Sequence, residues 1–365
     1  MENRVTRDGD KELELGLKYL KGDGVPVDET KALKYFMDSG RAGNGFGVYL
    51  SAHCLYNGIG IEADIKTAVK LYEIAANCGV SKAQLELGDC YFFGQGVRKN
   101  TTKAFELYQK AASNGEAEAM TNLGFCYYDG VGTNQNFDLA VEWFNKAAEK
   151  GDAQANYGLA VCYGAGNGVE KSAELSFEHC LKSAQAGNSD AMGLLGDMYY
   201  EGYVTLDKAK ALEWRIKATE AGNSEAAEIV GLKYFKGEDV EKNEKEAMRY
   251  FAIAAEAGYA VSCHNFAITI LQNECIQEEI DKATAYLKTA AGQGLPQSQY
   301  VLGLLYQRGE FVEKDEKMAF EWFNKASKKR HKEAMEALSR CYMNGTGVKA
   351  DPIKAVNIMM RAMKL

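Results

Sequence analysis

Hydrophobic and polar positions along the chain recur with a period of 36 residues. Each period holds two amphipathic stretches of helical length, separated by turns that carry glycine. A small residue, called here the anchor, marks the first stretch of each unit. One step between anchors is 35 residues, and every other step is 36. The ten anchors are Gly16, Ala52, Gly88, Gly124, Ala160, Gly196, Gly231, Ala267, Gly303 and Ser339.

Further columns keep the same register. A tyrosine stands three residues after the anchor in eight units, and a glycine stands six residues after it in nine. The pattern predicts a first helix from six residues before the anchor to five after it, ended by that glycine in a left-handed conformation. A second helix follows a capping residue and ends at a second glycine column. Nine of the ten residues that precede the second helices are good capping residues, Glu279 being the exception. The ten are Asp28, Asp64, Asn100, Asn136, Ser172, Asp207, Asn243, Glu279, Asp315 and Asp351.

A single helix pair is too small to bury its own apolar face, so consecutive pairs must stack on one another. The sequence therefore predicts an all-α solenoid of about ten 36-residue helix-turn-helix repeats. We expect one uninterrupted solenoid over residues 10–365, preceded by an N-terminal extension over residues 1–9.

These columns resemble the Sel1-like repeat family, whose members are related to tetratricopeptide repeats. The resemblance spans about residues 11–365 and is most specific in AQLELGDCYFFGQGVRKNTTKAFELYQKAASNG, residues 83–115. It implies a right-handed α/α superhelix that serves as an adaptor or scaffold for protein complexes. The second unit lacks the Leu-Gly anchor, and the eighth lacks the loop glycine and the tyrosine. We expect the eighth repeat to bend the solenoid or to form a different loop.

Composition and charge narrow the range of partners. The 365-residue chain is 46% hydrophobic and has a formal net charge of -8. A net-acidic protein is a poor non-specific ligand for nucleic acid or anionic membranes. The first 15 residues are mostly charged, and no run approaches the roughly 18 apolar residues that a membrane span needs. We therefore expect a cytoplasmic protein without nucleic-acid or membrane partners.

Cysteine and histidine placement gives little support to metal or redox chemistry. Nine cysteines without paired spacing predict free thiols, and the five that stand two residues after the anchor predict a small apolar core column. The four histidines are scattered, and the Gly-x-Gly runs follow no predicted strand. We expect no metal, no cofactor and no catalytic residue. The five core cysteines are Cys54, Cys90, Cys126, Cys162 and Cys341.

A hydrolase acting within the groove, such as a beta-lactamase-like activity, is the competing interpretation. Secreted cysteine-rich members of the family have been linked to penicillin binding, and they carry paired cysteines in each repeat. This chain has no such pairs. A buried, hydrogen-bonded nucleophile and base in a closed pocket would favour the enzyme, whereas an open aromatic groove would favour the adaptor.

In the related tetratricopeptide architecture the first helix of each unit lines the concave face. When the anchor is aligned with that architecture, five positions of each unit face the groove. They stand six and three residues before the anchor, and one, four and five residues after it. Aromatic residues recur there, and in units three to seven these positions hold eight acids against two bases. Packing between repeats and a solvated acidic face are the alternatives. The predicted partner-binding residues are Tyr49, His53, Tyr56, Phe92, Phe125, Tyr128, Tyr157, Asp197, Tyr200, Glu228, Phe235 and Tyr300.

We predict a protein or peptide partner that presents a basic segment with apolar anchors. One version of this function is a regulatory or immunity-type inhibitor that sequesters its partner. The last helix carries Met359, Met360, Met363 and Leu365 where a terminal repeat should be polar. These side chains either pack on their own unit or dock a partner, and a second copy at that site would give self-association.

Overall fold

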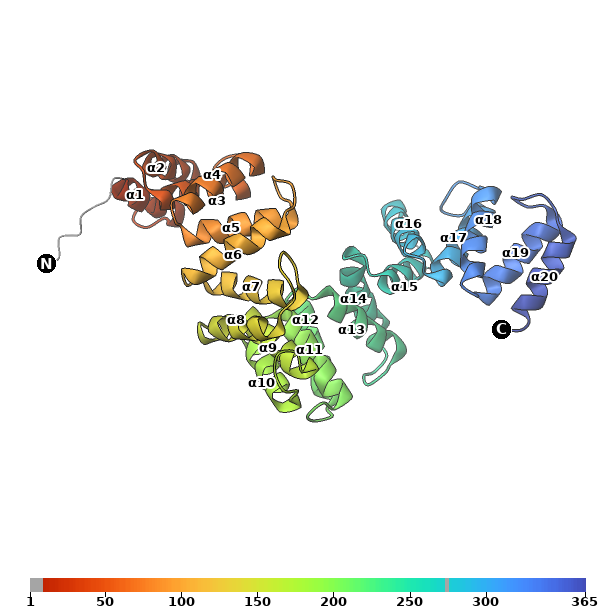
Figure 1. The fold of residues 1–365 in the computed structure, drawn as a ribbon. Helices are drawn as coiled ribbons and strands as arrows, with labels where there is room; N and C mark the ends of the chain where they lie inside the picture. The colour runs from red at the N-terminus through yellow and green to blue at the C-terminus, as the bar shows by residue number, and fades with distance from the viewer. Residues whose placement is uncertain (1–8, 273–275) are drawn as a thin grey trace. The chain divides into compact units, whose positions relative to one another are not determined.

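The structure, a computed structural model, describes residues 9–272 and 276–365. Within these residues all regular secondary structure is α-helical, in twenty helices (Figure 1). The chain divides into two compact units, Met1–Ala191 and Met192–Leu365, and α11 (Ser189–Glu201) runs across their boundary. A single solenoid over residues 10–365 stays a prediction.

The helices of unit 1 form consecutive pairs, each pair being one repeat. They are α1 (Asp10–Lys21), α2 (Glu29–Arg41), α3 (Gly45–Asn57), α4 (Ile65–Asn77), α5 (Ser81–Phe93), α6 (Thr101–Ser113), α7 (Ala117–Asp129), α8 (Phe137–Glu149), α9 (Ala153–Ala165) and α10 (Ala173–Gln185).

Unit 2 continues the same alternation of first and second helices. Its helices after α11 are α12 (Lys208–Glu220), α13 (Ser224–Lys236), α14 (Glu244–Glu256), α15 (Ala260–Leu271), α16 (Gln277–Gly292), α17 (Pro296–Arg308), α18 (Glu316–Lys328), α19 (Lys332–Asn344) and α20 (Pro352–Ala362).

The predicted capping chemistry sets the helix ends. Gly94 ends α5 with φ 77°, and its N–H donates to the Cys90 carbonyl at 2.9 Å. All nine predicted capping residues cap a second helix, as Asn100 does by accepting from the Lys103 N–H at 3.0 Å. Such a cap satisfies a backbone donor that the first turn leaves free.

The second helix of the eighth repeat does not begin after Glu279, as the position of that residue in the column predicts. Helix α16 begins at Gln277, so Glu279 lies in its first turn and its carboxylate accepts from the Ile276 N–H at 3.2 Å. The helix has 16 residues, against 13 in the second helices of the neighbouring repeats. The eighth repeat therefore does differ around its loop. Asn273, which replaces the loop glycine, lies outside the described residues.

The anchor is small because the second helix of the same repeat lies directly over it. A Cβ added to Gly124 would lie 2.6 Å from the ring of Phe144, which is fully buried. Gly88 is covered in the same way by Tyr108. This close approach joins the two helices of each pair into one hydrophobic core.

The tyrosine column joins consecutive pairs. Phe105 of α6 packs edge-on against Tyr127 of α7, with ring centroids 5.4 Å apart, and Phe320 of α18 does the same with Tyr342 of α19 at 5.3 Å. First helices of adjacent repeats also touch one another, α7 with α9 and α13 with α15, more extensively than any consecutive second helices of the described chain. In each unit one pair of adjacent first helices therefore approaches more closely than the second helices do.

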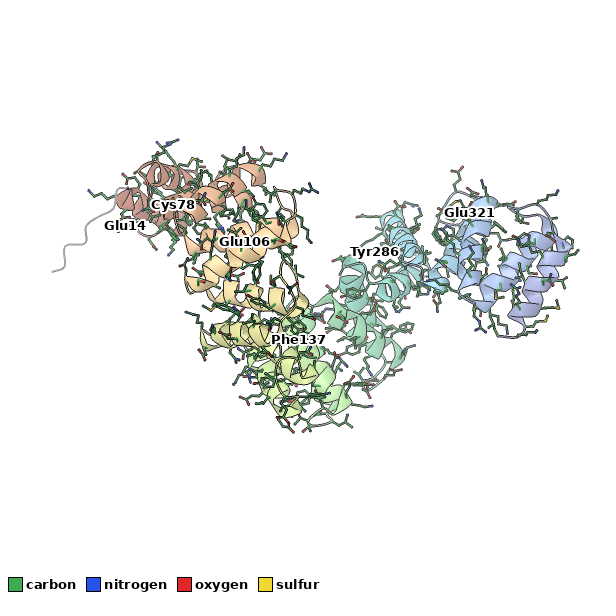
Figure 2. All side chains as sticks on the ribbon, viewed as in Figure 1. Glu14, Cys78, Glu106, Phe137, Tyr286 and Glu321 are labelled. Carbon is green, nitrogen blue, oxygen red and sulfur yellow. The ribbon has the colours of Figure 1, made fainter. Side chains whose placement is uncertain are left out.

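The cysteines differ sharply in exposure. Cys78, at the end of α4, is exposed, whereas the seven other described cysteines are buried (Figure 2). Burial raises the pKa of the Cys90, Cys126 and Cys162 thiols to about 12. Since the thiolate is the reactive form, these core thiols should be inert in the folded protein. The described cysteines are all free, and Cys275 lies outside the described residues.

Titration of the native protein with a thiol reagent tests this difference. We expect Cys78→Ser to remove one fast-reacting equivalent and Cys126→Ala to remove none from the fast phase. Under denaturing, non-reducing conditions the wild type should count nine thiols. A count of seven or fewer would mean that disulfides form in the native protein.

The last helix, α20, exposes part of its apolar surface. Met360 is 50% and Met363 73% exposed, whereas Ala362 is buried and Met359 is partly buried. Inward packing thus accounts for only part of the methionine cluster, and docking of a second copy here stays a prediction. None of the helices that the structure describes is long and apolar enough to cross a membrane.

Candidate functional site

A pocket on the first-helix side of unit 1 combines aromatic rings with carboxylates. It has a volume of about 350 Å³ and lies between α5 and α7, the first helices of the third and fourth repeats. We call it the acidic pocket. Its lining residues are Asp89, Phe92, Phe93, Tyr108, Glu118, Asn122, Phe125, Cys126, Asp129 and Val131.

The repeat register brings these side chains together. Asp89, Phe92 and Phe93 stand one, four and five residues after their anchor, and Phe125 stands one residue after the next anchor. The rings of Phe92 and Phe93 meet edge-on at 5.0 Å, and Phe125 rests against the buried Phe144 at 4.8 Å. Phe93 remains 63% exposed, so it is available to a partner at the mouth of the pocket.

The carboxylates around the pocket lack cationic partners. Asp89 Oδ1 accepts hydrogen bonds from the Tyr108 hydroxyl at 2.6 Å and from Asn122 Nδ2 at 3.4 Å, and no described residue donates to its other oxygen. In the part of the chain that the structure describes, Glu86, Asp89, Glu118 and Asp129 form no ion pair. The pocket is therefore locally acidic, and the charge of Lys82 offsets only part of the repulsion at Glu86 and Glu118.

Burial and mutual repulsion disfavour the charged forms of these groups. Burial raises the pKa of the Asp89 carboxyl, and the hydrogen bond from Tyr108 opposes that rise. The pKa of Glu86 is raised by burial and then by the charges of Asp89 and Glu118. The pKa of Glu118 is raised by burial and by Asp89 and Asp152. A cation placed among them would relieve this repulsion.

A second cavity extends the acidic surface toward the fifth repeat. It has a volume of about 360 Å³ and shares Glu118 and Asn122 with the acidic pocket. Asp152 and Gln154 line its far side, together with Asn188 at the end of the fifth repeat. The two cavities together outline a groove along the first helices of repeats three to five.

The raised pKa values predict how stability depends on pH. A carboxyl whose pKa is higher in the folded state binds more protons there than in the unfolded chain, so it lowers stability as pH rises from about 4 through the raised pKa. We expect a Glu86→Gln, Glu118→Gln double variant to melt on the order of 1 to 3 °C above the wild type at pH 7. The difference should vanish below pH 4. Equal melting temperatures at both pH values would contradict this electrostatic account.

The structure separates the other predicted groove residues of unit 1 into different environments. Tyr49 is buried against Tyr72, with ring centroids 6.0 Å apart, so its prediction as an open groove residue is wrong. Tyr56 donates to Gln95, and Tyr128 accepts from Asn167 at 3.0 Å, so both hydroxyls join their repeat to the next loop. His53 and Tyr157 are partly buried.

The predicted residues of unit 2 mostly make contacts inside the chain. Asp197 accepts from Arg215 at 2.7 Å. The Glu228 carboxylate accepts from the N–H and the hydroxyl of Ser262, at 3.0 and 2.9 Å, at the start of α15.

Aromatic residues of unit 2 follow the same trend. Lys233 Nζ lies over the ring of Tyr200, 4.4 Å from its centroid. Tyr300 packs against His331 at 5.2 Å, while Phe235 is 40% exposed. In unit 2 the carboxylates of Asp197 and Glu228 are therefore hydrogen-bonded within the chain.

Sequence reasoning missed three residues that matter to the acidic pocket. Glu86 stands two residues before its anchor, Asn122 stands two before the next, and Tyr108 comes from the second helix. A signal was present, because Glu86 and Asn122 occupy the same repeat position, two residues before the anchor, and both are polar. Tyr108 gave none, because the neighbouring repeats carry Tyr72 and Phe144 at the same place as core residues.

One histidine lies next to a serine, which is the arrangement that a hydrolase would use. His264 Nδ1 is 2.9 Å from the Ser298 hydroxyl, but Ser298 is fully buried and no described carboxylate orients the imidazole. The link joins α15 to the start of α17, as Glu228 joins α13 to α15. It therefore lends no support to the hydrolase alternative. Within the described residues no group of three His, Cys, Asp or Glu could hold a metal ion.

The chain is similar to known helical repeat proteins in sequence and in structure. The Sel1 repeat family model matches most of the chain, leaving the eighth repeat unmatched. A search of curated proteins finds no significant match. The matched residues are 12–36, 47–80, 81–116, 117–152, 153–188, 189–223, 224–259, 296–331 and 332–361.

Two solved structures resemble the chain over long stretches. A protective antigen present in uropathogenic Escherichia coli strains, with an SLR fold, is 31% identical with a TM-score of 0.60, and the match covers 98% of this chain and 78% of that one. A Sel1 repeat protein from Oxalobacter formigenes is 28% identical with a TM-score of 0.62, covering 67% of this chain and 96% of that one.

Proposed function

This chain belongs to the Sel1 repeat family, and from that premise we propose that it is a non-enzymatic scaffold that binds a protein partner. Sel1 repeat proteins generally mediate protein–protein interactions. In this chain the acidic pocket of unit 1 is the contact site, and the partner contributes a basic segment with apolar neighbours.

One observation carries the proposal: carboxylates without an ion pair and phenylalanine rings, of which Phe93 is exposed, share one cavity on the first-helix side of unit 1. Aromatic anchors supply contact area at low entropic cost, and a few of them usually dominate the binding free energy. Carboxylates at the rim speed association with a basic partner and disfavour acidic competitors. Together, the rings and the carboxylates favour a partner segment that carries both basic and apolar residues.

The groove over repeats three to five suits an extended segment rather than a small metabolite. Its two cavities are joined through Glu118 and Asn122, so a chain lying along the first helices would reach both. An inhibitor that sequesters one specific partner is one form that such a scaffold could take. The hydrolase alternative has no observation in its favour.

The test compares capture and affinity for paired variants. Native lysate is passed over wild type, over an Asp89→Asn, Glu118→Gln variant, and over a Glu106→Gln control. Glu106 is an exposed acid on α6 that does not line the pocket (Figure 2). A partner lost only from the pocket variant is then purified and its association kinetics are measured.

We expect the pocket variant to bind that partner at least about tenfold more weakly, with slower association and a weaker salt dependence. The Glu106→Gln control should match the wild type. Melting curves must show that all three proteins remain folded. Unchanged affinity and rate in the pocket variant would place recognition elsewhere on the chain.

A further inference from the structure

Repeats three and six place the same chemistry at two equivalent positions. Each has an aspartate one residue after its anchor, Asp89 and Asp197, and an aromatic residue four after it, Phe92 and Tyr200. They differ at the second-helix position that covers the anchor. Repeat three has Tyr108 there, and repeat six has Arg215.

In repeat six this aspartate and ring hold a guanidinium group. Arg215 Nη2 donates to Asp197 Oδ1 at 2.7 Å, and the guanidinium carbon lies 5.0 Å from the centroid of the Tyr200 ring. The Arg215 side chain is only 7% exposed. Its stem covers the anchor, since a Cβ on Gly196 would lie 2.7 Å from Arg215 Cγ. Unit 2 therefore contains a filled example of this arrangement.

In repeat three the equivalent aspartate lines a cavity, and Lys99 Nζ lies 5.5 Å from the centroid of the equivalent ring, Phe92. The Tyr108 ring covers the anchor and its hydroxyl reaches only one oxygen of Asp89. Beyond it lies the cavity of about 350 Å³, to which the next repeat adds Glu118 and Phe125. The pocket thus keeps the aspartate and ring of repeat six and adds a second carboxylate and a second ring, and no described residue forms an ion pair with its carboxylates.

We propose that the acidic pocket binds the side chain of an arginine carried by the partner segment. The proposal rests on the proposed function and names the residue that the pocket recognises. The guanidinium donates to Asp89 and Glu118 and lies against Phe92 and Phe125, as Arg215 does with Asp197 and Tyr200. Arginine fits better than lysine because its planar group has five donors, stacks on rings and is more weakly hydrated than an ammonium.

The inference predicts which small probes bind. Full-length protein is titrated with N-acetyl-arginine methylamide, with the lysine analogue and with the neutral citrulline analogue, and binding is followed by NMR. We expect saturable shifts for the arginine probe, confined to residues near the acidic pocket. Affinity should be at least about tenfold lower for the lysine and citrulline probes, because each lacks either the planar donor set or the charge.

Two variants test whether the pocket itself is responsible. Asp89→Asn keeps the shape and should weaken the arginine probe about tenfold or more. Tyr108→Arg should abolish binding, because its own guanidinium would occupy the pocket as Arg215 does in repeat six. Glu106→Gln should leave binding unchanged. If Tyr108→Arg fails to fold, the affinity of Asp89→Asn for the arginine probe decides whether the acidic pocket is the binding site.

The outcomes separate this inference from the proposed function. Equal affinities for the arginine and lysine probes, both lost in Asp89→Asn, would overturn the arginine assignment and leave the basic-segment scaffold intact. No saturable binding, or binding that Asp89→Asn does not weaken, would also overturn it. If the captured partner is equally indifferent to Asp89→Asn, the proposed function fails as well.

Discussion

Replacing Phe144 by alanine is expected to lower the free energy of unfolding by about 3 to 5 kcal/mol. Phe144 is fully buried, and a Cβ placed on Gly124 or Gly158 would lie 2.6 or 2.8 Å from its ring. These glycines belong to two successive first helices, α7 and α9, so the ring fills the space between repeats four and five. Its removal leaves a cavity that helices so closely packed can only partly close.

Urea denaturation measures this loss, with Glu142→Ala on the same helix as the control. Glu142 is exposed and pairs only with Lys146, so its replacement should cost no more than about 0.5 kcal/mol. Because each repeat is stabilised mainly by its neighbours, the Phe144 variant should also lose the acidic pocket beside it. A cost below about 1 kcal/mol would contradict the packing described for repeats four and five.

Replacing Asp197 by alanine should cost about 2 to 3 kcal/mol, because it leaves the buried Arg215 guanidinium without its carboxylate. The Asp197 side chain is 48% exposed, which lets water reach the site and keeps the cost below that of a fully buried pair. Arg215→Met removes the buried charge, so no group is left that needs a carboxylate, and its apolar side chain still covers the anchor. We expect that variant to change stability by less than about 1 kcal/mol, in either direction.

The two variants and their double combination are compared by denaturant unfolding. In the double variant the cost of Asp197→Ala should largely disappear, because no buried cation remains. Additive costs would show that Asp197 stabilises the repeat by some other contact. They would also weaken the comparison between repeat six and the acidic pocket.

Much of the fold could be predicted because equivalent positions of the repeats carry the same residue types and make the same packing contacts. Small anchors, capping residues such as Asn100 and loop glycines such as Gly94 act within one or two turns, so their spacing in the sequence is enough. Glu279 misled because it keeps the register of the column, while α16 starts three residues earlier than that register requires. Local sequence did not reveal this earlier start.

The site was predicted less completely because side-chain partners come from distant positions. Phe92 and Phe125 do line the acidic pocket, as their register implied. Tyr49 shares a groove column but turns into the core beside Tyr72. The Glu228 carboxylate accepts a hydrogen bond from Ser262, 34 residues away, at the start of the next first helix. The spacing in the sequence places these residues on one face of the first helices, but tertiary packing decides which side chains remain exposed to a partner.

Site-specific photocrosslinking tests the central claim most directly. A benzophenone amino acid is introduced in place of Phe93, at the mouth of the acidic pocket, and separately in place of Glu106 on α6. After irradiation with the captured partner, mass spectrometry identifies the joined peptides. The account predicts crosslinks from position 93 to one partner segment containing arginine beside apolar residues, and none to that segment from position 106. Crosslinks from position 106 alone, or from position 93 only to an acidic segment, would contradict it.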